Sequence, residues 1–189
     1  MLIQSHLFLS GKIKEVINVN EEGNLKSASF SMGSIIPDIH PDKRNLPHNI
    51  TASLPFLVKK TEECIKVGKG DNELSSKNLG IITHFLADYF CLAHNDENMN
   101  LWEHMLYEKK LHKALTSEEL IPSDNFKIPL RDIEEWVREK HNLYLNSTHT
   151  IEKDIFFIQE VCLNVTRSLV TATIAERERI PVGGLSILT

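Results

Sequence analysis

The apolar residues of this chain recur mostly at steps of three and four, which is the spacing of one face of an α-helix. The pattern is clearest over 150–178, where Ile151, Ile155, Ile158, Cys162, Val165 and Leu169 alternate steps of four and three. Period-two alternation bounded by turn signals, which is typical of strands, is absent. The sequence therefore predicts an all-α protein with helices over 2–18, 50–67, 72–93, 99–115, 130–145 and 150–178.

Polar or proline-containing stretches separate the predicted helices. Asn18–Ser27 is a polar loop, and three prolines and a glycine within 32–49 exclude a continuous helix there. Two prolines break the chain again within 117–129, and residues 179–189 form a short tail. Asp71 or Asn72 is expected to cap the 72–93 helix. Because no repeat or low-complexity segment divides the chain, residues 1–189 are predicted to form one compact multi-helix domain.

Composition narrows the classes of function. The chain is 41% hydrophobic and 25% charged, with a net charge of −5, as in an ordinary globular protein. Lys and Arg cluster only in "EKKLHK" (108–113), so long nucleic acid is not an expected partner. We find no secretory signal and no uninterrupted apolar run of a membrane span. The expectation is a cytoplasmic protein with at most transient membrane-surface contact; secretion by another route and the oligomeric state stay open.

Histidine and carboxylate pairs mark the interior of two successive helices. In "GIITHFLADYFCLAHND" (80–96), His84 and Asp88 are four residues apart within an apolar run, and His94 follows. On the next helix, His104 and Glu108 repeat the spacing of four, so each pair shares one helix face. Burying such groups without partners is costly. Both pairs are therefore expected to meet partners inside the protein.

A metal centre explains the two pairs better than isolated salt bridges do. One His-x-x-x-Asp pair alone is more simply a salt bridge or a satisfied core histidine. Two inward pairs with a third histidine between them favour a metal, because mixed imidazole and carboxylate ligands suit Zn²⁺, Fe, Mn²⁺ or Ni²⁺. Three further histidines, by contrast, are predicted to lie at the surface or at helix ends: His112, His141 and His149.

These residues resemble the superfamily of zinc-dependent phospholipases C and S1/P1 nucleases, most closely the bacterial zinc-dependent phospholipase C family. The family pattern His-x3-Asp-x5-His, followed by His-x3-Asp/Glu, is matched here by His84, Asp88, His94, His104 and Glu108. Upstream, an early histidine, a loop aspartate and a further histidine match His6, Asp38 and His48, with His40 as a rival to His48. The resemblance covers 1–108 and implies an all-α fold with a centre of three zinc ions.

The resemblance also implies a ligand set for each ion. One ion would be held by His48, His84 and Asp88, with Asp38 as a further ligand. A second would be held by His94, His104 and Glu108. The third would be held by His6, by Asp88 as a bridge, and by the amine and carbonyl of Met1, where the family has an N-terminal tryptophan. An α-amino group with a pKa near 8 can lose its proton for that role.

The implied activity is hydrolysis of a phosphodiester. Metal ions lower the pKa of water and hold phosphoryl oxygens, and Asp38 would orient or deprotonate the attacking water. The leading hypothesis is a zinc-dependent phosphoric diester hydrolase of phospholipase C type, acting on a phospholipid headgroup or another small phosphodiester. The alternatives are a P1-nuclease-like nucleotide phosphodiesterase and a non-catalytic metal-binding protein. The sequence does not choose between these substrates, nor between zinc and Fe or Mn.

Overall fold

The computed structural model describes residues 1–19, 25–40, 46–68, 70–118 and 128–178. Within those residues it has helices and no strand, so the predicted all-α fold is confirmed. The elements in chain order are α1 (Ile3–Val19), α2 (Ser27–Gly33), α3 (Ile36–Ile39), α4 (Ile50–Gly68), α5 (Asn72–Tyr89), the 3-10 turn η1 (Leu92–His94), α6 (Leu101–Ser117), the 3-10 turn η2 (Leu130–Asp132), α7 (Ile133–Leu145) and α8 (Ile151–Glu178). Parts of the predicted loops and the predicted tail, at 20–24, 41–45, 119–127 and 179–189, lie outside the described residues.

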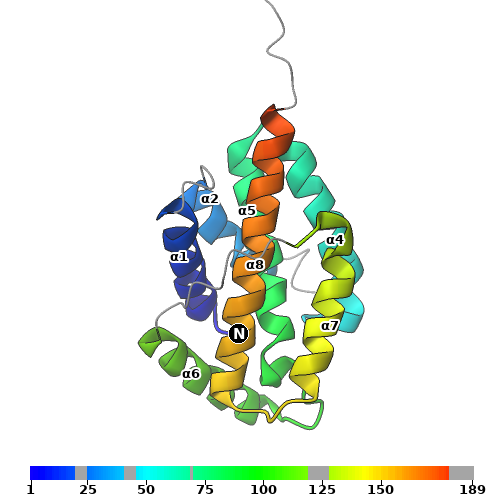
Figure 1. Cartoon of the computed structure of the whole chain (residues 1–189). Coiled ribbons are helices and arrows are strands. Elements are labelled where there is room, and N and C mark those ends of the chain that lie inside the picture. Colours follow the sequence, from blue (N-terminus) through cyan, green and yellow to red (C-terminus); the bar gives the residue numbers. More distant parts are fainter. Residues whose placement is uncertain (20–24, 41–45, 69, 119–127, 179–189) are drawn as a thin grey trace, which may run out of the picture.

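The central element is α5, which contacts α1, α2, α3, α4 and α8 (Figure 1). Every residue from Asn78 to Tyr89 is buried, as the nearly all-round apolar pattern predicts. Asp71 caps its start, because the Asp71 side chain accepts a hydrogen bond from the Leu74 N–H at 2.9 Å. In the view of Figure 1, α6 lies across one end of the bundle, beside the beginning of α1.

The end of α5 differs from the prediction, since the helix stops at Tyr89 rather than near residue 93. The Asn95 side chain donates hydrogen bonds to the carbonyls of Tyr89 and Cys91, at 3.0 and 2.9 Å. The Leu92 N–H donates a hydrogen bond to an Asp154 carboxylate oxygen at 2.9 Å. These side chains satisfy backbone groups that a longer helix would have paired internally, and the chain turns into η1.

Helix α2 was not predicted, and it depends on a close contact between two backbones. A Cβ added at Gly80 would lie 2.1 Å from the Phe30 carbonyl oxygen and 2.7 Å from the Ser34 N–H nitrogen. A Cβ at Gly33 would lie 2.1 Å from the Lys77 carbonyl oxygen. The weak helix-forming sequence "SASFSMG" is therefore held in place by packing on α5 rather than by its own propensity.

This contact gives a direct prediction. We expect Gly80→Ala to lower the free energy of unfolding by about 1–3 kcal/mol, because a methyl group there meets backbone that can yield only if α2 moves. Gly11→Ala on α1 is the matched control: nothing lies within 4 Å of its added Cβ, so its unfolding free energy should be unchanged or raised. Urea unfolding of the two variants measures the difference, and equal midpoints would contradict the contact.

Helix α8 packs along α4 and α5 and contacts α6 and α7 as well. Its Ile151–Glu176 stretch is long and apolar enough to cross a membrane by length and composition, which on its own is weak evidence of a span. Most of that stretch is buried inside the protein, as in the core helix of a globular domain. The predicted core role of 150–178 thus agrees with the packing.

Candidate metal centre

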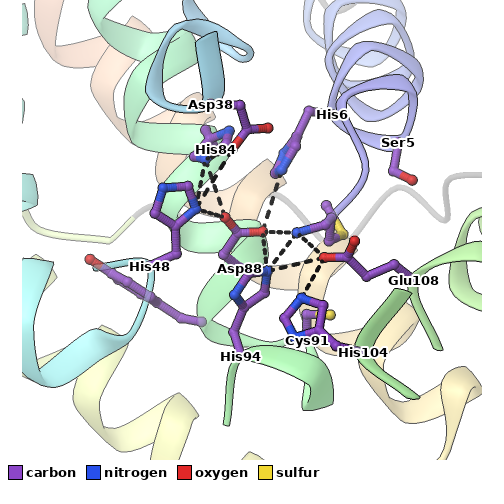
Figure 2. A network of polar contacts seen from close by, with 12 residues as sticks. Ser5, His6, Asp38, His48, His84, Asp88, Cys91, His94, His104 and Glu108 are labelled. Carbon is purple, nitrogen blue, oxygen red and sulfur yellow. Dashed lines mark hydrogen bonds and ion pairs between the residues drawn. The ribbon is translucent and has the colours of Figure 1, made fainter. Parts of the chain in front are cut away.

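The centre is built around α5, which places His84 and Asp88 one turn apart with both side chains fully buried. Seven other groups converge on them from five directions (Figure 2). Six of them are labelled in Figure 2 and come from α1, from α3, from the residues before α4, from η1 and from α6: His6, Asp38, His48, His94, His104 and Glu108. The seventh is the amine of Met1 at the start of the chain, which contacts Asp88. The structure therefore brings together all nine residues that the sequence analysis singled out, although their metal binding stays a prediction.

Asp88 lies at the middle of the cluster. Its Oδ1 atom is 2.5 Å from the Met1 amine, 3.3 Å from His6 Nε2 and 3.4 Å from His94 Nε2. Its Oδ2 atom is 2.7 Å from His48 Nδ1 and 3.2 Å from His84 Nε2. Five nitrogen atoms thus share one carboxylate, which suits a group that bridges two positive charges.

Three groups of side chains could each hold a metal ion, with their ligand atoms all within 4.8 Å of one another. They are His6–His84–Asp88, Asp38–His48–His84 and His94–His104–Glu108. The third group is one of the implied ligand sets. In the other two, His84 takes part in both groups, whereas the sequence analysis shared only Asp88 between ions. Asp88 also makes short contacts with His48 and with the Met1 amine, so it lies next to all three groups.

The Met1 amine reaches the interior of the cluster. It lies 2.7 Å from His94 Nε2 and 3.1 Å from Glu108 Oε1, in addition to its contact with Asp88. Burial by itself lowers the pKa of this amine, but the nearby negative charges, chiefly that of Asp88, outweigh burial and raise the pKa to about 11. Without a metal the amine is therefore an ammonium ion that neutralises carboxylates, and binding a metal there would release its proton.

The carboxylates are held in their charged forms. Burial would raise the pKa of Asp88, yet the Met1 amine and the surrounding histidines hold it well below its usual range. Burial likewise opposes ionisation of Glu108, but His94 and the Met1 amine lower its pKa to about 2. Burial, followed by the charge of His84, lowers the pKa of His6 to about 3. Ionised carboxylates beside a neutral imidazole are the protonation states that metal binding requires.

Two histidines show that the donor set fits a metal ion. Both ring nitrogens of His6 are buried and make no hydrogen bond, although Nε2 lies near Asp88. His84 donates from Nδ1 to the Ser34 carbonyl at 2.8 Å, which fixes the ring and directs Nε2 at the carboxylates. With Nδ1 carrying the donated proton, Nε2 of His84 can present its lone pair to a cation placed between it and the Asp88 carboxylate. The residues present therefore fit zinc.

Sequence reasoning missed the residues that support this centre. Buried Asp154 accepts hydrogen bonds from the Leu92 N–H and from the hydroxyl groups of Tyr107 and Tyr144, at 2.9, 2.9 and 2.8 Å. These bonds fasten α6, α7 and η1 to α8, and so set η1, which carries His94, against α6, which carries His104 and Glu108. A single sequence gives no spacing signal for contacts between such distant positions.

The structure also places the four histidines that lie outside the centre. His141, predicted at the surface or at a helix end, lies within α7 and is buried, and its Nε2 bonds to the Asn95 side-chain oxygen at 2.9 Å; the prediction was wrong because α7 turns this position inward. Half-buried His112 bonds to Ser5 at 3.0 Å, and His149 is exposed as predicted. Of the two rivals for one ligand position, exposed His40 lies outside the three groups, whereas His48 is in one of them.

The centre opens into a cleft of about 660 Å³ that is lined in part by Met1, Asp38, His48, Glu108 and Lys109. Asp38 is partly exposed there, with Oδ1 3.6 Å from His84 Nε2 and 3.9 Å from His48 Nδ1. Burial raises the pKa of Asp38 despite the nearby histidines. Lys109, which belongs to the lysine-rich stretch 108–113, brings a positive charge to the same cleft.

Comparison with known proteins agrees with the geometry. The family model of zinc dependent phospholipase C matches residues 5–151, which include every histidine and carboxylate of the centre. No curated protein and no solved structure gives a match. The cluster of possible metal ligands and the family match together support a metal-dependent, phospholipase-like hydrolase. The chain belongs to the zinc dependent phospholipase C family.

Proposed function

We propose that this protein is a zinc-dependent phosphodiesterase of phospholipase C type, which hydrolyses the phosphodiester bond of a phospholipid headgroup at a centre of three zinc ions. The observation that carries the proposal is the position of Asp88. Its two carboxylate oxygens contact the Met1 amine, His48 and His94, one member of each proposed ligand set. Zinc bound there supplies activation of water and stabilisation of phosphoryl charge. His48, His84 and Asp88, with Asp38 as a further ligand, would hold one ion; His94, His104 and Glu108 would hold a second; and His6, the Met1 amine and the same Asp88 would hold a third.

The residues of the cleft have separate tasks in this scheme. Asp38 stands at the edge of the centre with a free approach to the cleft, so it would orient a water molecule and accept its proton. Lys109 would pair with a phosphoryl oxygen of the substrate. The fixed hydrogen bond from His84 to Ser34 keeps the His84 ring in place throughout.

The test is hydrolysis of a chromogenic phosphodiester by the full chain, before and after zinc removal by a chelator. We expect turnover that is lost with zinc and restored by adding it. A second assay compares choline phosphate release from phosphatidylcholine with cleavage of a thymidine phosphodiester. Preference for the nucleotide would make the protein a P1-nuclease-like enzyme, and zinc binding without turnover of any of these substrates would make it a non-catalytic metal-binding protein.

A further inference from the structure

One side of α6 presents large apolar side chains to solvent. Leu101 and Trp102 are 77% and 70% exposed, and Met105 and Leu106 are 41% and 43% exposed. The helical spacing continues this side into exposed Lys109 and Lys113. We call these six residues the α6 stripe. A tryptophan and a leucine exposed together to this degree are typical of a surface that meets a partner.

The α6 stripe borders the metal centre. The inward side of α6 carries His104 and Glu108, and Lys109 of the stripe lines the same cleft as Met1. Ile3 of α1, which is 41% exposed, lines the same cleft. A partner that covered the stripe would therefore also lie over the mouth of the centre.

The chemistry of the stripe suits a phospholipid surface. Its first half is apolar and its second half is basic, and the acidic residues of α6, Glu103 and Glu108, lie outside it. An indole ring is favoured at the boundary between hydrocarbon and headgroups, and Lys reaches phosphate groups from such a position. Exposed tryptophan and leucine side chains together with lysines are the residue types that interfacial membrane helices use. The six residues of the stripe include two lysines and no carboxylate, although the chain as a whole carries −5.

We propose that the α6 stripe docks on a phospholipid bilayer, with Leu101 and Trp102 in the interfacial layer, Lys109 and Lys113 among the phosphates, and the cleft facing the headgroups. The inference deepens the proposed function, because docking would present a membrane lipid to the metal centre. Binding to the bilayer requires no turnover, so the two proposals can fail separately.

The experiment measures binding of the zinc-loaded full chain to vesicles of phosphatidylcholine with one fifth phosphatidylglycerol. The chain has two tryptophans, so Trp136→Phe leaves Trp102 as the reporter. We expect a blue shift of Trp102 fluorescence, quenching by brominated acyl chains, and co-sedimentation of the protein with vesicles. The Leu101→Ser/Trp102→Ser variant, tested by sedimentation, should bind at least about tenfold more weakly.

A matched control tests whether the loss of vesicle binding is specific to the α6 stripe or follows from removing any exposed apolar side chains. Leu143→Ser/Phe156→Ser removes two side chains of comparable exposure, 60% and 52%, from α7 and α8, and should leave vesicle binding unchanged. Both pairs should hydrolyse a soluble phosphodiester at the wild-type rate. The proposal would be overturned if the two double variants lost vesicle binding equally, or if neither of them lost it. Loss of self-association rather than of vesicle binding in the α6 pair would also overturn it and would assign the stripe to contacts between copies of this chain.

Discussion

Replacing Asp88 by Asn should remove about two of three zinc equivalents and reduce phosphodiester hydrolysis to background. The carboxylate contacts the Met1 amine and His6 through one oxygen and His48 and His84 through the other. A neutral amide cannot bridge two cations in this way. The set formed by His94, His104 and Glu108 does not depend on Asp88 as a ligand, so about one equivalent should stay. Metal analysis after dialysis, with the chromogenic assay in parallel, measures both effects.

The control for this variant lies on the same helix. Asp71→Asn makes the same chemical change at the N-cap of α5, where Asn serves as well as Asp, and should leave metal content and activity unchanged. Removing the Asp88 charge leaves the Met1 ammonium buried without its nearest counter-charge, so we also expect the variant to lose stability. His48→Ala, at the partly exposed edge of the centre, therefore provides a second test, and its zinc content should also fall. Full metal content in both the Asp88→Asn and the His48→Ala proteins would contradict the shared centre.

Adding Gly-Ser ahead of Met1 should lower the zinc content by about one equivalent. The extension converts the amine into a peptide nitrogen, which has no lone pair available for a metal. It must also enter a fully buried space, where the amine now lies 2.5 Å from Asp88 and 2.7 Å from His94 Nε2. The same two residues added after Thr189 are the control and should leave the zinc content unchanged. Equal zinc in both extended proteins and the unextended chain would show that the Met1 amine is not a ligand.

Much of the fold follows from the sequence because the signals are local. The four-residue spacing of His84 and Asp88, and of His104 and Glu108, placed each pair on one helix face, and the structure turns both faces to a common centre. Apolar periodicity likewise predicted the buried central helix, since a helix that is apolar nearly all round must be enclosed. These inferences need no knowledge of which helices pack together.

The parts that sequence reasoning missed depend on contacts between distant segments. Helix α2 has little propensity of its own and forms where Gly33 and Gly80 let two backbones meet. The end of α5 is set by Asn95 and Asp154. Asp154 accepts a hydrogen bond from the N–H of Leu92, which is more than 60 residues away in the sequence. His141 was misread because a histidine near a helix end carries no local sign of burial. Such features emerge only when the packing is known.

The central claim is a centre of three metal ions assembled by nine residues, and counting metal tests it most directly. The unextended chain is purified without a tag, equilibrated with zinc and freed of unbound metal, and zinc is then measured per chain by atomic emission. The proposed function predicts about three equivalents. Two equivalents would contradict the proposed ion held by Met1 and His6. One or none would contradict the shared centre and leave Asp88 as a buried carboxylate neutralised only by the Met1 amine and its histidines.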